Sequence, residues 1–189
     1  EAELACPVCG AEYRIANGVA NFAHAVPAHA VPAHAVPAEP AEPFTSTMVL
    51  RLAALLGVTE SVLPVALVGQ YAVVSEQLAS FVAAPQLLVN SGHAVPGPGA
   101  SRIMVHDRLP LGVETLAAVA LDAAHARPDM LASAVRALRL GGRLVAPADV
   151  PIPAGMRELA RDATEWVAET TTRASGLVEL RRRAPDVTE

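Results

Sequence analysis

One stretch, LPVALVGQYAVVS from Leu63 to Ser75, constrains the fold of this chain more than any other. Val65 to Val68 is a short, continuous apolar run that ends at Gly69, which is the pattern of a parallel strand buried on both faces. Ser75 with Glu76 then starts a helix whose apolar stripe faces the core. Because α/β folds place ligands where a buried strand ends on a glycine and leads into a helix, this stretch predicts a ligand site at Gly69. The residues of the stripe are Leu78, Ala79, Phe81 and Val82.

The rest of residues 44–189 repeats this alternation of short apolar runs with helical segments. The expected strands after the first are Gln86–Asn90, Arg102–Val105, Leu116–Leu121, Arg143–Ala146 and Leu177–Arg183. The other expected helices are Met48–Leu56, capped by a residue of Thr45–Thr47 and ended by Gly57, then Pro128–Leu140, ended by Gly141–Gly142, and Pro153–Thr170. Strands that alternate with helices predict an α/β fold with a doubly wound, mostly parallel sheet.

The last expected helix contains Trp166, the only tryptophan, which we expect to pack in the core or to contact a partner. Four charged residues of the same segment are separated by helical spacings and would form a solvated face. They are Glu158, Arg161, Asp162 and Glu165.

Composition and charge exclude several classes of function. Apolar residues make up 52% of the chain but aromatic residues only 3%, so the core is expected to be aliphatic. The net charge of -5 gives no long-range attraction to nucleic acid or to an anionic membrane, and the dense basic cluster Arg181–Arg183 is expected to be a solvated strand end. No apolar run approaches the roughly 20 residues that cross a bilayer. We therefore expect a soluble, cytoplasmic protein, and because the chain begins at Glu1 and not at a methionine, we expect residues upstream.

Cys6 and Cys9 form a Cys-Pro-x-Cys-Gly knuckle, the most specific local motif in the chain. At this spacing both thiolates can face one tetrahedral metal, and Tyr13, Ile15 and Val19 would form small strands behind them. A structural zinc site takes four ligands, however, and this knuckle supplies two. Two cysteines in a CxxC argue against a disulfide framework. A redox role is the weaker alternative, because a redox CxxC normally opens a helix, whereas a glycine turn follows here.

The segment CPVCGAEYRIANGVANF resembles the second half of a zinc ribbon found in small partner proteins of methyltransferases and at the N-terminus of many bacterial methyltransferases. In those proteins the pattern CPxCGxxYPIxxGIPxF follows an earlier CxxC, and here Arg14 and Ala20 replace its prolines. The resemblance implies that Cys6 and Cys9 bind zinc if an upstream cysteine pair exists. Otherwise the knuckle is vestigial and free of metal.

Residues 24–43 differ abruptly in composition from the segments around them. The pentapeptide HAVPA begins at His24, His29 and His34, and its prolines forbid a helix and favour extended polyproline II. A histidine metal tract is the alternative, but a period of five does not bring side chains to one face of a helix with three residues per turn. We therefore interpret 24–43 as a linker between a partial zinc-ribbon-like segment at 1–23 and a main domain at 44–189.

From Val49 to about Pro147 the order of elements resembles a class I S-adenosylmethionine-dependent methyltransferase. RLAALLGV resembles the helix before the first strand, VALVGQY stands where the family has an acidic residue followed by GxGxG, and MLASAVRALRLGGRLVAP is similar to LLxExxRVLRPGGRLVxx. The loop HDRLPLG resembles the segment near the adenine. The resemblance implies a Rossmann-like methyltransferase fold with S-adenosylmethionine as the cofactor. The cofactor-binding positions that it implies are Gly69, Tyr71, Asn90 and Asp107.

The chain departs from the family at the positions that hold the cofactor. Leu67 takes the place of the motif's acid. Tyr71 and Val73 replace its second and third glycines. Asn90 stands where an acid usually binds the ribose hydroxyls. Removing one polar interaction from a buried site costs about 1 to 3 kcal/mol, so several such changes together can abolish cofactor binding.

Asp122 and His125 follow the strand Leu116–Leu121, where the family places substrate or catalytic groups. An acid beside a histidine can orient the ring as a general base. We favour the interpretation that both residues cap the next helix and lie on its surface. Asp107 is likewise either an adenine contact or a loop residue that caps a turn.

Functions from different classes follow from these patterns. The first is a divergent methyltransferase-fold protein that is not catalytic and has a structural or partner-binding role, with another protein or as a homo-oligomer. The alternative is an active S-adenosylmethionine-dependent methyltransferase that acts on a small molecule. A weaker third is an accessory to RNA modification, against which the acidic charge counts. We favour the first, because a fold survives the decay of a site whereas catalysis does not.

Overall fold

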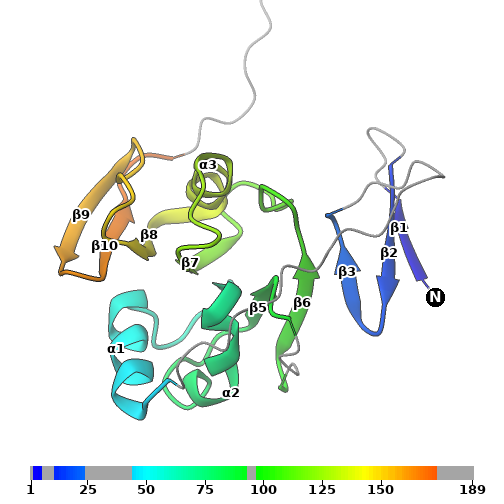
Figure 1. Ribbon diagram of the computed structural model, residues 1–189, viewed down its shortest axis with the longest axis horizontal. Helices are drawn as coiled ribbons and strands as arrows, with labels where there is room; N and C mark the ends of the chain where they lie inside the picture. The colour runs from blue at the N-terminus through cyan, green and yellow to red at the C-terminus, as the bar shows by residue number, and fades with distance from the viewer. Residues whose placement is uncertain (1, 6–10, 24–43, 93–96, 174–189) are drawn as a thin grey trace, which may run out of the picture.

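The computed structural model describes residues 2–5, 11–23, 44–92 and 97–173, and these form a ten-stranded sheet with helices against both of its faces (Figure 1). The strand order is β1-β2-β3-β6-β5-β4-β7-β8-β10-β9. The strands are β1 (Ala2–Ala5), β2 (Glu12–Ala16), β3 (Val19–Asn21), β4 (Val65–Val68), β5 (Gln86–Val89), β6 (Ala100–Met104), β7 (Leu116–Leu121), β8 (Leu138–Pro147), β9 (Met156–Arg161) and β10 (Glu165–Thr170). The helices are α1 (Ser46–Leu56), α2 (Ser75–Leu78) and α3 (Pro128–Ala137), with a 3₁₀ helix at Gly69–Val74.

The centre of the sheet is parallel. Every neighbouring pair from β3 through β6, β5, β4 and β7 to β8 runs parallel. The strands at the two ends, β1 and β2 on one side and β10 and β9 on the other, pair antiparallel. Helix α3 covers one face, and α1 and α2 cover the other. This architecture confirms the predicted α/β fold with a doubly wound, mostly parallel sheet.

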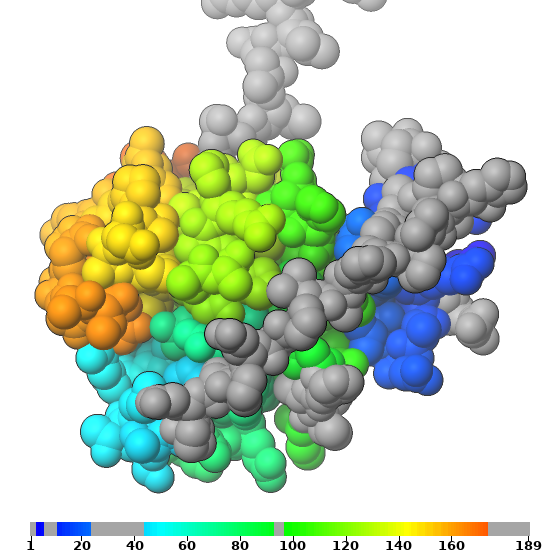
Figure 2. Space-filling view, in the orientation of Figure 1, coloured from blue at the N-terminus to red at the C-terminus, as the bar shows by residue number. Residues whose placement is uncertain are grey.

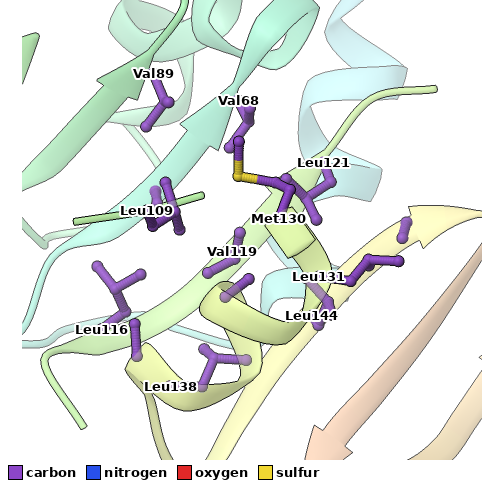
Figure 3. Close-up of a cluster of buried hydrophobic side chains, with 14 of the residues drawn as sticks. Val68, Val89, Leu109, Leu116, Val119, Leu121, Met130, Leu131, Leu138 and Leu144 are labelled. Atoms are coloured by element: carbon purple, nitrogen blue, oxygen red, sulfur yellow. The ribbon is translucent and has the colours of Figure 1, made fainter. Parts of the chain in front are cut away.

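The side chains of β4 alternate between two buried clusters, one on each face of the sheet. Ala66 and Val68 belong to the cluster that packs under α3 (Figure 3). Val65 and Leu67 belong to the cluster under α1 and α2. Both clusters are mostly aliphatic, as the composition predicts, and Trp166 is the one fully buried aromatic ring among the described residues.

Helix α1 has the predicted cap and the predicted end, and it begins at Ser46, two residues before the predicted start. The Thr45 hydroxyl accepts a hydrogen bond from the Met48 backbone N–H at 3.3 Å, and Gly57 ends the helix with a left-handed φ of +62°. A Cβ at Gly57 would overlap the Arg143 guanidinium, which donates to two carbonyls of the last helical turn. Strand β8 thus places a cation at the C-terminal end of α1, where the helix dipole favours it.

The segment after β4 follows the prediction only in part. A 3₁₀ helix precedes α2, and α2 itself is a single turn. Leu78 and Val82 are buried as expected, but Ala79 and Phe81 are exposed. The predicted stripe is therefore wrong for these two residues, because α2 ends before them and the chain does not keep the helical period.

Helix α3 ends earlier than predicted. It stops at Ala137, and Leu138, which is 1% exposed, already belongs to β8. Gly141 and Gly142 therefore do not close the helix but lie in β8 where its register with β7 shifts. Burial of the Leu138 side chain beside β7 is favourable, so this residue adopts the strand conformation and does not continue the helix.

The predicted helix Pro153–Thr170 is wrong, because these residues contain the hairpin β9–β10. The chain reverses at Asp162, whose carboxylate accepts hydrogen bonds from the backbone N–H groups of Thr164 and Glu165. The charged residues therefore do not share a helix face. Trp166 is fully buried in β10, and its indole N–H donates to a backbone carbonyl at 2.8 Å, so the packing interpretation of this residue is confirmed. Pairing with β8 and burial of this ring override the helical spacing.

The N-terminal strands extend the main sheet. β2 contains Tyr13 and Ile15, and β3 begins at Val19, as predicted for strands next to the knuckle. β3 then pairs in parallel with β6, so this segment is joined to the main domain by backbone hydrogen bonds.

Several predictions concern residues outside the described ranges. These residues include Cys6 and Cys9, the linker 24–43 and the strand Leu177–Arg183. The predicted partial zinc ribbon, linker and terminal strand therefore stay predictions. No helix in the described part of the chain is long and apolar enough to span a membrane.

Candidate functional site

The carboxyl ends of β4 and β7 meet where the direction of strand addition reverses. From β4 the sheet continues to β5 and β6 on one side, whereas β7 and β8 lie on the other. Val68 and Leu121 are register partners, so Gly69 and Asp122, which follow them, lie next to each other. Ligand sites of open α/β sheets lie at such a switch point, so this edge is the candidate site.

Gly69 has a left-handed backbone (φ +64°) and no room for a side chain. A Cβ at this position would overlap Asp122 Oδ2 and would lie 2.6 Å from His125 Nδ1. The space over the glycine is therefore filled by the chain itself. Glycine is therefore required at this position, as predicted. The contacts with Asp122 and His125 explain the requirement without a ligand.

The carboxylate of Asp122 bridges the ends of β4 and β7. Asp122 is 7% exposed, and Oδ2 accepts a hydrogen bond from the Gln70 backbone N–H at 2.8 Å. Oδ1 accepts from the His125 backbone N–H at 3.0 Å and from the ring Nδ1 at 2.6 Å. Burial alone would raise the pKa of Asp122, but the His125 ring and the Gln70 amide outweigh burial and hold this pKa below its ordinary value. Asp122 and His125 thus form a pair, and the same carboxylate also caps the backbone that follows β7.

Tyr71 is held by a network that joins the turn after β4 to β10 and α1. Its hydroxyl donates to Glu165 Oε2 at 2.9 Å, and Glu165 Oε1 pairs with Arg51 Nη2 at 2.7 Å. Arg51 also pairs with Asp162, and the Tyr71 ring packs on Phe44 with 5.9 Å between ring centroids. Burial and the Glu165 carboxylate raise the pKa of Tyr71 above its ordinary value, so the hydroxyl keeps its proton. The second glycine position of the motif is thus filled by an anchored ring.

The other two predicted cofactor residues follow the next two strands. Asn90 comes directly after β5 with a left-handed φ of +52°, and its Oδ1 accepts a hydrogen bond from the Val105 backbone N–H at 2.9 Å. This oxygen therefore holds the ends of β5 and β6 together. Asp107 lies in the loop after β6, where its side chain is 44% exposed and faces Arg108. Gly69 and Tyr71 thus share one turn, whereas Asn90 and Asp107 follow strands one and two places away in the sheet.

This arrangement bears on whether S-adenosylmethionine can fit. The Gln70 amide is bonded to Asp122, and the Tyr71 hydroxyl is bonded to β10. Leu67, in place of the motif's acid, is fully buried in an apolar cluster, and the Asn90 side-chain oxygen is already bonded. In this arrangement the residues do not fit the cofactor, because its polar groups would have to replace hydrogen bonds that the chain makes with itself.

Metal binding concerns different residues. In the part of the chain that the structure describes, no three or more His, Cys, Asp or Glu side chains gather where they could hold a metal ion. The predicted ligands Cys6 and Cys9 lie outside that part. Zinc binding at the knuckle therefore stays a prediction.

The network around Tyr71 is the part of the site that sequence patterns do not reveal. Arg51 and Glu165 lie far apart in the chain and belong to no common motif, and helical spacing predicts each of them only as a helix residue. A turn signal is present, since an Asp followed two residues later by a Thr favours a reversal of the chain at Asp162. That turn places Glu165 at the start of a strand, but it does not place this residue beside Tyr71.

Comparisons with known proteins return structural similarity alone. No family model matches the chain, and no curated protein matches it. Among solved structures the chain is similar to a geranyl diphosphate methyltransferase in complex with SAM, with 16% identity over 53% of this chain and 48% of that chain and a TM-score of 0.44. It is also similar to the Haloferax volcanii complex between the Trm112 methyltransferase activator and a methyltransferase (11% identity, 67% and 90% covered, TM-score 0.48) and to the antibiotic-resistance methyltransferase Kmr (15% identity, 69% and 94% covered, TM-score 0.45). The chain spans about half the length of the first of these proteins.

Proposed function

We propose that this chain is a methyltransferase-fold protein that has lost S-adenosylmethionine binding, is not catalytic and acts by binding a partner. The observation that carries the proposal is the hydrogen bond from the Gln70 N–H to Asp122 Oδ2, made directly over Gly69. In nucleotide-binding turns of this kind, the backbone after the glycine is left free to meet the ligand. Here the first amide after Gly69, that of Gln70, already donates its hydrogen bond to the Asp122 carboxylate.

The cost of opening the turn supports the same proposal. A ligand at Gly69 has to displace a buried carboxylate, which would then give up its hydrogen bonds from Gln70 and His125. A buried polar group left without a partner costs about 1 to 3 kcal/mol, and a charged group costs more. The free energy needed to break these hydrogen bonds lowers the affinity of the protein for the incoming ligand.

A second candidate, an active enzyme that acts on a small molecule, is favoured by the Asp122–His125 pair. The ring Nδ1 lies 2.6 Å from the carboxylate, and the His125 side chain is 24% exposed. A carboxylate that holds the proton on Nδ1 leaves Nε2 as the basic nitrogen, which is how general bases are oriented. This candidate requires the turn after β4 to open for the cofactor.

Calorimetric titration of S-adenosylmethionine and S-adenosylhomocysteine into the full-length protein tests the first proposal. We expect no binding heat with either ligand at millimolar concentration. Binding with a micromolar Kd contradicts the proposal. Circular dichroism on the same sample controls for folding, and its zinc content tests the separate proposal that Cys6 and Cys9 hold a metal.

The second candidate has its own test, which applies if the cofactor binds. In a small-molecule screen, formation of S-adenosylhomocysteine should be lost in His125→Gln and kept in His106→Gln, since His106 lies exposed in the loop after β6. Equal activity of the two variants counts against a general base at His125.

A further inference from the structure

The turn between β2 and β3 has an Asn-Gly sequence at the surface. Ala16 and Val19 are register partners, so Asn17 and Gly18 form a two-residue turn between the strands. Their backbones are both left-handed, with φ of +51° and +73°, which is the type I′ turn that Asn-Gly sequences favour. Figure 2 shows the atoms of these strands, in blue, at one edge of the molecule. The turn is therefore well formed, and both of its residues are exposed.

Asparagine is a thermolabile residue, and the Asn17 side chain is free to react. Its amide makes no hydrogen bond to another residue that the structure describes. A Cβ built on Gly18 would meet nothing within 4 Å, so the space around the Gly18 nitrogen is open. The bond across such a turn uses the N–H of the residue after it, here Val19, so the turn does not need the Gly18 N–H. An electrophilic side-chain carbon and an unhindered backbone nitrogen are thus neighbours.

The other two asparagines of the chain are held differently. The side-chain oxygens of Asn21 and Asn90 each accept a hydrogen bond from a backbone N–H, at 3.0 Å and 2.9 Å. Phenylalanine follows the first and serine the second, and both side chains crowd the next backbone nitrogen, which glycine leaves open. Asn17 therefore combines an unbonded amide with a glycine neighbour.

We propose that Asn17 is a site of spontaneous deamidation in the folded protein. The Gly18 nitrogen gives its proton to a base in solution and attacks Asn17 Cγ. The new N–Cγ bond closes a succinimide ring, the Cγ–Nδ2 bond breaks, and the side-chain nitrogen leaves as ammonia with a proton from water. Water then opens the ring. Cleavage of the new N–Cγ bond leaves aspartate, and cleavage of the original peptide bond leaves isoaspartate. An amide and water thus give a carboxylic acid and ammonia, with no oxidant or reductant.

The isoaspartyl product changes the main chain of the hairpin, because it lengthens the chain path by a methylene group. A two-residue type I′ turn matches the twist of its strands, and a longer path does not. Strand β3 has three residues and joins the N-terminal strands to β6 through the register pairs from Val19↔Arg102 to Asn21↔Met104. The isoaspartyl form therefore holds the N-terminal strands to the main sheet more weakly. This inference does not rest on the proposed function.

Peptide mapping by mass spectrometry tests the inference on the full-length protein after storage at mildly alkaline pH. We expect Asn17 to shift to aspartate and isoaspartate, with fragmentation to locate the change, while Asn21 and Asn90 stay intact. A parallel sample in urea reports the same reaction in the unfolded chain. In Asn17→Gln, whose longer side chain closes the ring far more slowly, the shift should be lost.

Hydrogen exchange tests the structural consequence. The matched control is Asn17→Asp, which adds the same charge and keeps the type I′ turn but does not lengthen the main chain. We expect the amides of β3 and β6 to lose more protection in the isoaspartyl fraction than in this variant. Circular dichroism of both samples controls for global unfolding.

The opposite results overturn the inference. If Asn17 stays intact in the folded protein, the folded turn is not a deamidation site, and conversion in urea alone would show that the turn protects it. Equal conversion of Asn21 or Asn90 in the folded protein would show that the open turn does not select the site. Equal exchange in the isoaspartyl fraction and in Asn17→Asp would contradict the weaker joining of β3 to β6. Titration with S-adenosylmethionine is independent of each of these results.

Discussion

The turn Gly69–Tyr71 and the solvent-facing side chains of α1 and the 3₁₀ helix differ in how their groups are satisfied. In the turn, the Gln70 amide and the Tyr71 hydroxyl are bonded within the chain, and Gly69 has no free space above it. In contrast, the apolar side chains of Leu50 and Val73 are 54% and 65% exposed. The comparison teaches that a fold can satisfy the polar groups of a turn at a strand end within the chain and still leave large apolar side chains exposed.

The largest effect is expected from Gly69→Ala. The new Cβ overlaps Asp122, and alanine at a left-handed φ is strained, so we expect a loss of about 2 to 4 kcal/mol in the free energy of unfolding. Gly92→Ala is the matched control, since Gly92 has a φ of +56° but nothing within 4 Å of its added Cβ. Its cost should be the backbone strain alone, about 1 to 2 kcal/mol. Urea unfolding measures both variants, and equal losses would show that Asp122 does not fill the turn.

Asp122→Asn should cost about 1 to 3 kcal/mol, because the amide cannot replace a carboxylate that accepts all three hydrogen bonds. The pKa of Asp122 is lowered in the folded protein, so its stabilising contribution is present above its unfolded pKa, about 3.9, and is lost as the pH falls through the lower folded pKa. Urea unfolding between pH 2 and pH 6 should therefore show a flatter acid limb in Asp122→Asn than in the wild type. Asp107→Asn, in the loop after β6, is the control, and the same flattening in that variant would contradict the prediction.

Tyr71→Phe should have a smaller effect. It removes the hydroxyl that donates to Glu165 but keeps the ring that packs on Phe44, so we expect a loss of about 1 kcal/mol. A double-mutant cycle with Glu165→Ala, which removes the acceptor of this hydrogen bond, isolates the interaction, with thermal unfolding as the measurement. Additive losses in the cycle would mean that the network around Tyr71 does not hold the turn closed.

The smallest effect on stability is expected on the solvent-facing side of α1. Leu50→Glu should change the free energy of unfolding, measured by urea, by no more than about 0.5 kcal/mol, because the side chain is half exposed and has no bonded polar partner to lose. A large loss of stability would instead mean that Leu50 packs within the chain.

The sequence was most informative where one segment carries its own pattern. The continuous apolar runs predicted β4, β5 and β7, and Thr45 with Gly57 predicted the limits of α1. The same reasoning predicted that Gly69 ends the first strand and that Asp122 and His125 follow the fourth. These features depend on local periodicity, capping and backbone preference, which neighbouring residues decide.

Reasoning from spacing failed where two segments compete for the same residues. Charged residues from Glu158 to Glu165 have the spacing of a helix face, yet pairing with β8 makes them a hairpin. Leu138 continues a helical pattern, yet burial beside β7 makes it a strand residue. In both cases a partner strand supplied hydrogen bonds and apolar contact that no local window contains.

The sequence by itself determined the strand–helix alternation, the glycine after the first strand and the absence of the motif's acid and later glycines. Only the tertiary structure decided what replaced them. The Asp122 carboxylate reaches Gln70 because β7 lies beside β4, and Tyr71 meets Glu165 because the hairpin brings β10 to the same edge of the sheet. Such interactions join residues far apart in the chain, and their free energy depends on distances and burial that strand pairing alone establishes.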